Sequence, residues 1–482
     1  MSIHYKDKAV RGVGWSAIDG IAQYIVTFLI GILLARLLSP DDFGLIGLTA
    51  IFVALSNTFI NGGVIQALIR KKEVTDHDYN TAFLVNIGMS VFLYFLLFVC
   101  APFISEFFHR GELTLLIRVS SLKFIIGSLS LVQNVQLVKR IDFKTKAKIS
   151  LASAVIGGSI GIALAFRGFG VWALVIQELA TISIRTISLW SVLKWVPNFQ
   201  FYLESFKELF GYGSKIMISE LLDTLWREMS NAVIGRFYNP STLGQYARSR
   251  QFSSILSNNL TLVVQRVTLP ILADIQDERE RLANAYRKIV KCSMFVSAIG
   301  MFLMGAMSEP LLYCLIGPKW HEAAVYLPLI CISGSTYPLQ AINLNILKVQ
   351  GRSDLILNLE VIKKLVAIIP LIIGALVGIM PMLYTYLLTC VISFFLNSHY
   401  SGKLLGYSSI QQLRDISPSY VIAIVVATSV FFLKYIPASP WVILPLQIMV
   451  ATIVFFCICY WRQIDEYVEI KGIMTDYLRK MK

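Results

Sequence analysis

Apolar stretches of about 20 residues follow one another along the whole chain, separated by short polar segments. Each stretch is long enough to cross a bilayer as a helix, whereas a membrane β-barrel would show alternating segments of about ten residues. The pattern predicts an all-α polytopic membrane protein with about 14 transmembrane helices. We expect these spans at 13–37, 43–69, 79–108, 114–138, 147–166, 170–193, 213–236, 243–270, 287–308, 323–347, 354–377, 381–403, 417–433 and 441–461.

A short motif occurs twice, each time between two apolar stretches. Arg, Pro and Gly recur with the same spacing in Arg36–Gly44 and Arg236–Gly244. A second, weaker match relates Arg140–Phe143 to Arg352–Leu355, again at equivalent places. Internal repeats with an even number of spans have the same orientation in the membrane. We therefore predict two six-helix lobes forming a parallel repeat, followed by two additional helices and a tail, with bounds 1–200, 201–405 and 406–482.

Two features of the helix boundaries complete this prediction. Phe199, Leu203, Phe206 and Phe210 fall on one helical face, which predicts a short amphipathic helix at the membrane surface before the seventh span.

Lysine and arginine concentrate at one set of loops and at both ends of the chain. The loops predicted to lie outside contain only Arg110, Arg167, Lys319 and Lys434. Because basic residues remain cytoplasmic during insertion, both termini are expected in the cytoplasm.

Composition supports the membrane class, since 56% of the residues are hydrophobic and only 15% are charged. The net charge of +14 is explained by this topology and by contact with anionic lipids, so it does not indicate nucleic-acid binding. The histidines and cysteines lack metal-binding spacing, and no phosphate-binding glycine loop ends in Lys-Ser/Thr. No large loop exists to carry a catalytic domain. The sequence therefore favours a non-enzymatic protein without a metal or a bound cofactor.

Charged residues inside the predicted spans are the best candidates for function, because an unpaired charge in hydrocarbon costs about 3 kcal/mol. The basic residues outnumber the acidic ones and include Arg36, Arg118, Lys123, Arg185, Arg227, Arg236, Arg248, Arg250, Arg266, Lys363 and Lys364. Those near the ends of spans, such as Arg36, Arg236 and Arg266, can reach the interface along their own side chains.

The eighth predicted span has the clearest polar face. Arg250, Ser254, Ser257, Asn258, Thr261 and Gln265 fall on one side of that helix. Such a stripe fits a hydrated path, and polar packing between helices is the alternative. Other candidates for a substrate cavity are Lys123, Arg227, Asn57 and Asn61. Asp19, Glu178 and Asp223 are candidates for coupling to H⁺ or Na⁺, although Asp223 and Arg227 could also pair with each other across one helical turn.

Several segments resemble a known family. Lys8–Ala17, Ala35–Leu45, Ala67–Glu73 and Gly168–Leu174 are similar to Wzx-type polysaccharide flippases. These belong to the multidrug/oligosaccharidyl-lipid/polysaccharide exporter superfamily, and the colanic acid exporter branch is the most similar. The resemblance extends from residue 1 to about residue 400 and is weakest over the last two predicted spans.

This resemblance implies the cargo and the location. Members of the family move an oligosaccharide on undecaprenyl pyrophosphate across the bacterial inner membrane by alternating access, and polysaccharide polymerase machinery is an expected partner. In related lipid flippases, cavity arginines come from the early spans and the eighth span, and Arg250 matches best here. The first predicted span departs from that pattern, because it carries Asp19 and no arginine deep in the membrane. A lipid II flippase and a cation-coupled multidrug exporter remain the alternatives.

Overall fold

The computed structural model describes the backbone of residues 3–481 and the side chains of residues 20–60, 63–472, 475 and 479. Every regular element within residues 3–481 is a helix, as the sequence predicts. Within the described part of the chain, ten helices are long and apolar enough to cross a membrane, or eleven if the bent pair Leu113–Ser128 and Leu131–Lys139 forms one span. The chain is therefore a multi-pass membrane protein, and the larger number of spans stays a prediction.

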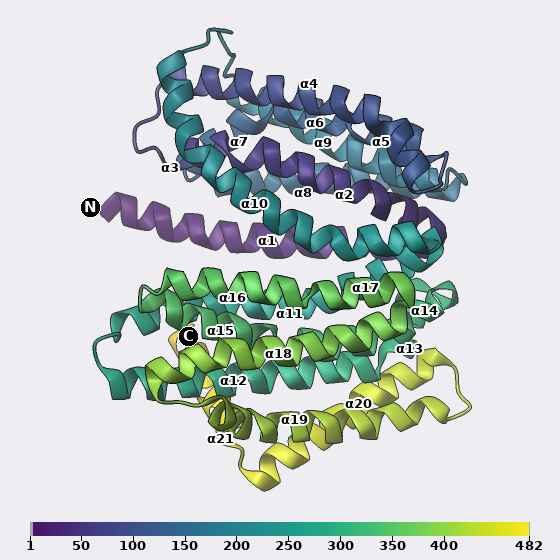
Figure 1. The fold of residues 1–482 in the computed structure, drawn as a ribbon, viewed down its shortest axis with the longest axis vertical. Coiled ribbons are helices and arrows are strands. Elements are labelled where there is room, and N and C mark those ends of the chain that lie inside the picture. Colours follow the sequence, from purple (N-terminus) through teal and green to yellow (C-terminus); the bar gives the residue numbers. More distant parts are fainter. Residues whose placement is uncertain (1–2, 482) are drawn as a thin grey trace. The chain divides into compact units, whose positions relative to one another are not determined.

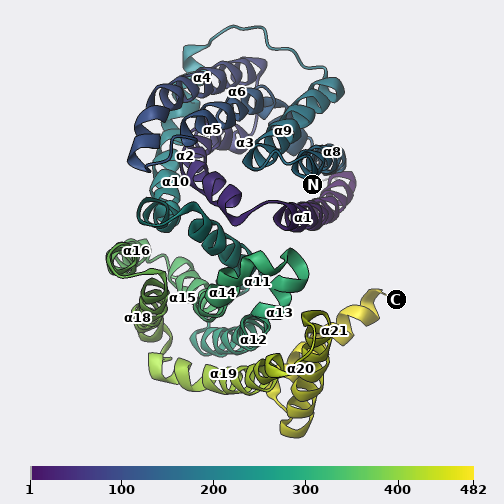
Figure 2. The ribbon, with the colours of Figure 1, turned by 90° about the vertical axis from the view of Figure 1, so that its right-hand side faces the viewer.

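The chain forms two compact units, Met1–Gly244 and Gln245–Lys482. The first contains α1 (Ile3–Leu37), α2 (Pro40–Gly62), α3 (Val64–Arg70), α4 (Asp76–Phe107), α5 (Leu113–Ser120), α6 (Leu122–Ser128), α7 (Leu131–Lys139), α8 (Phe143–Phe166), α9 (Val171–Leu193), α10 (Leu203–Phe237) and the start of α11 (Pro240–Asp274). Within this unit α1 packs on α8, α8 packs on α9, and α10 covers α2 and α3 (Figures 1 and 2).

The predicted short surface helix before the seventh span is wrong. Residues 203–237 form one continuous helix, α10, because nothing between them removes a backbone hydrogen bond. In its first turns the side chains of Ser205 and Leu209 are buried, whereas those of Leu203 and Phe210 are exposed. The aromatic face recognised in the sequence is therefore the outer face of a long helix, where Phe206 stacks on Phe210 with ring centroids 5.2 Å apart.

Some predicted spans are broken at small or polar residues. The predicted span 43–69 is interrupted at Gly63, where a Cβ on Gly213 of α10 would lie 2.5 Å from the Gly63 backbone. The predicted span 114–138 is divided into α5, α6 and α7, with a bend of 43° before α7. Side chains of α9 support this bend, since Trp190 donates to the Leu129 carbonyl at 2.8 Å and Thr186 donates to Ser130 Oγ at 3.1 Å. Such partners satisfy polar groups that a helix break releases.

The repeated motif begins equivalent helices and brings them into contact. Both α1 and α10 contain 35 residues, and both α2 and α11 begin at the motif's proline. Ser39 caps α2 and Asn239 accepts from the Thr242 N–H at 2.8 Å. A Cβ at Gly44 would lie 1.8 Å from the Pro240 carbonyl oxygen, and one at Gly244 would lie 2.0 Å from the Pro40 carbonyl oxygen. The two copies therefore pack reciprocally.

A charged network joins the loop after α3 to α10. Lys71 Nζ lies 3.0 Å from the buried Asp78 carboxylate and 2.7 Å from that of Glu208. Burial opposes the charge on Lys71, but hydrogen bonds to Glu208 and Asp78 more than compensate, so the pKa of Lys71 is raised. These contacts fix the end of α10 that is predicted to be cytoplasmic.

The second unit continues α11 and is organised around α12 (Arg279–Ala306), which packs on α14, α15 and α19. Its other elements are α13 (Ser308–Ile316), the 3₁₀ helix η1 (Pro318–Trp320), α14 (His321–Gly334), α15 (Tyr337–Val349), α16 (Ser353–Val366), α17 (Ile368–Leu376), α18 (Ile379–Leu405), α19 (Ser409–Phe431), η2 (Phe432–Tyr435), α20 (Pro440–Arg462) and α21 (Asp465–Met481). The core includes Tyr286, Met294, Ile342 and Leu359, all fully buried. The predicted lobes at 1–200 and 201–405 describe sequence repeats, and their bounds stay a prediction.

Candidate functional site

A cavity of about 170 Å³ lies inside the first unit among α2, α6, α7 and α9. Its polar lining includes Asn57, Lys123, Ser128, Ser130, Asn134, Glu178, Arg185 and Thr186. Lys123 is 6% exposed, and its Nζ lies 2.5 Å from Glu178 Oε1. A lysine withdrawn from water in this way requires a counter-ion, which Glu178 supplies. The structure thus brings together three residues that the sequence predicts as separate candidates: Asn57 and Lys123 for the substrate cavity and Glu178 for ion coupling.

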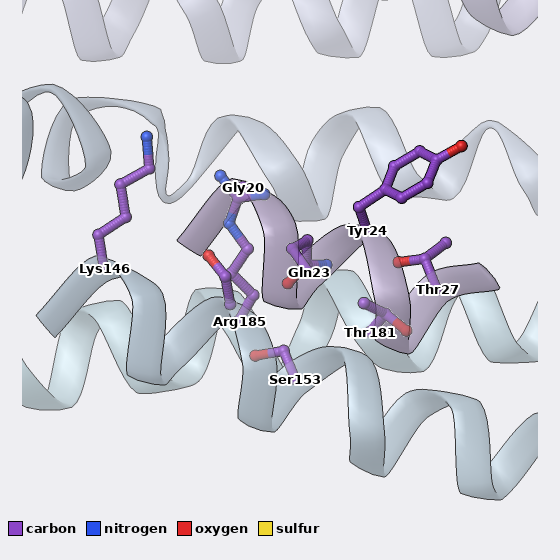
Figure 3. Close-up of a pocket in the computed structure, with 9 residues that line it drawn as sticks. Gly20, Gln23, Tyr24, Thr27, Lys146, Ser153, Thr181 and Arg185 are labelled. Atoms are coloured by element: carbon purple, nitrogen blue, oxygen red, sulfur yellow. The ribbon is translucent and has the colours of Figure 1, made fainter. Parts of the chain in front are cut away.

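A second cavity of about 440 Å³ adjoins α1, α8 and α9. Its lining consists of Gly20, Gln23, Tyr24, Thr27, Lys146, Ser150, Ser153, Thr181 and Arg185. Figure 3 shows Arg185 and Gln23 near the middle of this group and Lys146 at one end. The side-chain amide oxygen of Gln23, Oε1, is buried and makes no hydrogen bond within the described part of the chain. A polar ligand or water entering this cavity would satisfy it.

Close packing of α8 positions the walls of this second cavity. A Cβ at Gly157 would lie 2.0 Å from Thr181 Oγ1 on α9, and one at Gly158 would lie 2.2 Å from the Ile30 side chain on α1. Small residues allow membrane helices to approach closely where lipid gives no hydrophobic driving force. These glycines therefore place the polar residues of α1, α8 and α9 around one space.

Arg185 lines both cavities, and this makes it the central charged group of the site. Among the residues whose side chains are described, the two linings together contain the cations Lys123, Lys146 and Arg185 and the carboxylate of Glu178. The remaining polar groups are hydroxyls and amides. Such a set can neutralise a phosphate or carboxylate and can hydrogen-bond to sugar hydroxyls.

The sequence pattern marked Arg185 as a charge within a predicted span without assigning it to the site, and it did not reveal Lys146. Glu178 and Arg185 are seven residues apart on α9, which places them on one helical face, so this spacing could have revealed Arg185. Lys146 offered no comparable signal, because it lies in the basic loop region that topology already explained. The side chains of Asp19 and Asn61 lie outside the described residues.

The other candidates of the first unit lie on α10. Asp223 and Arg227 are exposed, whereas Thr224 between them is buried. Thr224 Oγ1 lies 3.0 Å from Thr58 Oγ1 of α2, and Arg227 Nη2 donates to Thr224 Oγ1 at 3.1 Å. Arg227 is therefore held at the α2–α10 contact, and its role in binding stays a prediction, as does that of Asp223.

The predicted polar stripe on α11 is divided between different surroundings. Ser257 is buried and packs towards Gly334 of α14, and its hydroxyl donates to the Ser253 carbonyl at 3.0 Å. Asn258 is exposed, while Thr261 is half-buried and donates to the Ser257 carbonyl at 2.7 Å. Arg250 is half-buried and close enough to interact electrostatically with Tyr337 and Tyr386. Its expected contact with cargo stays a prediction.

The described residues contain no group of three or more His, Cys, Asp or Glu side chains that could hold a metal ion. The fold and these cavities define a helical multi-pass membrane protein with a polar interior in its first unit. The structure is similar to the lipid II flippase MurJ in an inward closed conformation, with a TM-score of 0.72 over 93% of this chain and 99% of that one. The identity is 13%, so this similarity shows the fold alone.

The family follows from the sequence comparison. Residues 33–325 match the family described as polysaccharide biosynthesis protein, and the chain belongs to this family. It is 27% identical over 323 residues to the succinoglycan biosynthesis transport protein ExoT of Rhizobium meliloti, covering 67% of this chain and 65% of that protein. It is also 22% identical to the lipopolysaccharide biosynthesis protein WzxC of Escherichia coli, covering 77% and 75% of the two chains. The resemblance to polysaccharide flippases is confirmed.

Proposed function

We propose that this protein flips an oligosaccharide linked to undecaprenyl pyrophosphate across the bacterial inner membrane, for the synthesis of a cell-surface polysaccharide. The observation that carries the proposal is the pair of cation-rich polar cavities that share Arg185 inside a bundle of membrane helices. A diphosphate crossing hydrocarbon needs cationic partners, and sugar hydroxyls need amides and hydroxyls. Membership of a polysaccharide biosynthesis family supports this cargo class.

The proposed cycle is alternating access without ATP. The cargo headgroup passes through a polar interior while its polyprenyl tail stays in lipid. Arg250 supplies a cation from α11, and Lys123 and Arg185 supply cations from the first unit. Polysaccharide polymerase machinery receives the flipped unit, and both chain termini lie in the cytoplasm.

The Lys123–Glu178 pair is the proposed point of ion coupling. Glu178 is 48% exposed and lines the smaller cavity, so a proton or Na⁺ can reach its carboxylate. Neutralising Glu178 would release Lys123 to bind an anionic group of the cargo. Because the Lys123 ammonium group would exchange Glu178 for the cargo anion as its partner, ion entry would be coupled to cargo binding.

The test is complementation of a strain that lacks its polysaccharide flippase. We expect Arg185→Gln to lower polymer at least tenfold and to accumulate lipid-linked repeat units, because a charge-assisted contact worth about 1.5–3 kcal/mol is lost. Arg167→Gln is the matched control, since Arg167 is exposed in the loop after α8 and lines neither cavity. Normal polymer from Arg185→Gln at normal protein level would overturn the assignment of this site.

A second candidate function is the flipping of lipid II, the activity of the flippase MurJ, whose fold this chain shares. Lipid II is also a diphosphate-linked saccharide, so the cavities fit its chemistry. Rescue of a strain depleted of its lipid II flippase would support this alternative, and failure there with rescue of polysaccharide export would exclude it. A multidrug exporter of cations is disfavoured because Lys123, Lys146 and Arg185 outnumber Glu178 in the cavities.

A further inference from the structure

A separate pocket of about 510 Å³ lies within the second unit, where α18 ends and α19 begins against α12. Its lining is Ala283, Asn284, Arg287, Leu405, Gly406, Tyr407, Gln411, Arg414 and Asp415. None of these residues belongs to the cavities of the first unit. The pocket is at the end of the helices that is predicted to face the cytoplasm.

One wall of this pocket is rigid. Arg287 binds Asp415 through two hydrogen bonds, of which the Nη2–Oδ1 contact is 2.8 Å long. Tyr407 donates its hydroxyl to Asp415 Oδ2 at 2.6 Å, and its ring centroid lies 5.7 Å from the Arg287 guanidinium carbon. Tyr407 and Asp415 are buried, so the arrangement is anchored in the core of the unit.

The charge left for a ligand is positive. The Asp415 carboxylate is already engaged by Arg287 and Tyr407, so it adds little repulsion towards an anion. Arg287 donates two of its N–H groups to Asp415, and 53% of its side chain is exposed, so its other N–H groups can reach a ligand. Arg414 is exposed at the same pocket, and the side chains of Asn284 and Gln411 add neutral hydrogen-bonding groups.

The exposed residues of α19 that neighbour Gln411 and Arg414 in the sequence are apolar. Ile410 is 76% exposed and Leu413 is 46% exposed, and the same helix continues outward with the exposed Val421 and Ile424. Since α19 is long and apolar enough to cross a membrane, this outward face is suited to lipid chains. A cationic pocket thus adjoins a lipid-facing helix at the level where headgroups lie.

We propose that this pocket binds the phosphate headgroup of an anionic membrane phospholipid. Arg414 and the exposed edge of Arg287 receive the phosphodiester, Asn284 and Gln411 bind headgroup hydroxyls, and the acyl chains lie along Ile410 and Leu413. Basic pockets between membrane helices on the cytoplasmic side are suited to such headgroups. An acidic peptide would match the arginines but would gain nothing from the exposed apolar face of α19.

The experiment measures phosphatidylglycerol retained by the full-length protein in native mass spectrometry, after purification from phosphatidylcholine nanodiscs with and without phosphatidylglycerol. We expect Arg414→Gln to weaken retention about tenfold, because a charge-assisted contact is lost. Asn284→Asp should weaken it too, by placing a carboxylate beside the phosphate. Arg279→Gln removes the same charge from an exposed position outside the pocket and should leave retention unchanged.

Competition identifies the source of the anion. Retention that survives millimolar inorganic phosphate and polyglutamate supports the lipid. Loss of retention with inorganic phosphate would assign the pocket to a free anion, and loss with polyglutamate would assign it to an acidic protein; either result would overturn the proposal. Equal retention in Arg414→Gln, Asn284→Asp and wild type would overturn it as well.

Discussion

Gly44 and Gly244 occupy equivalent positions in the two repeats, and each packs against the carbonyl group of the other repeat's proline. A Cβ at either position would lie 2.0 Å or less from that oxygen, which is closer than any real contact. The glycines are therefore required by a close backbone approach, and the spacing shared by the two motifs has a structural cause.

Replacement of either glycine should destabilise the protein. We expect Gly44→Ala and Gly244→Ala each to cost about 3 kcal/mol, because the backbones must separate to admit a methyl group. Thermal unfolding of the detergent-solubilised protein measures this. Gly88→Ala is the control, since no atom lies within 4 Å of a Cβ there. Equal melting temperatures for all three variants would contradict the close approach.

The Lys123–Glu178 pair should respond unequally to its two single substitutions. Glu178→Gln leaves a buried ammonium without its counter-ion and should cost about 3 kcal/mol, whereas Lys123→Met removes the buried charge and should cost less. Unfolding measurements on both variants, compared with Lys123→Glu/Glu178→Lys, check this. A larger loss from Lys123→Met than from Glu178→Gln would show that the lysine does not depend on this partner.

Arg250 should contribute to transport more than to folding. Arg250→Ala is expected to accumulate lipid-linked repeat units in the inner leaflet, while Arg250→Lys keeps the charge but loses the bidentate geometry and should stay partly active. Polymer and protein level are measured together in the flippase-null strain. Normal polymer from Arg250→Ala would remove Arg250 from the cargo path. Loss of protein in proportion to polymer would indicate helix packing instead.

The topology can be tested by labelling intact cells with a membrane-impermeant thiol reagent. A cysteine at Thr145 should be protected, because residues 139–148 are predicted to lie in the cytoplasm. A cysteine at Arg110, exposed in the loop after α4, should be labelled and serves as the positive control. Labelling at position 145 would reverse the predicted orientation.

The helical class and many of the spans could be predicted because bilayer thickness imposes a length that hydropathy records directly. The breaks could not, since those at Gly63 and Ser130 depend on α10 and α9 packing against them. The same limit applies to the site. Lys123 and Glu178 were recognised as costly charges, but their pairing across 55 residues depends on how α6 meets α9. Local patterns show that a charge needs a partner, not which partner it has.

The packing of α10 has a consequence for the order in which the chain is made. The surfaces of α2 and α3 that α10 covers are synthesised before residue 71, but α10 is complete only at Phe237. Until then Gly63 and the motif at Pro40–Gly44 lack the elements that pack against them. A nascent chain that ended near residue 200 would contain α1 to α9 but not α10, so it could not close its first compact unit. Released chains truncated at residue 200 and at residue 244 would therefore differ strongly in their resistance to protease.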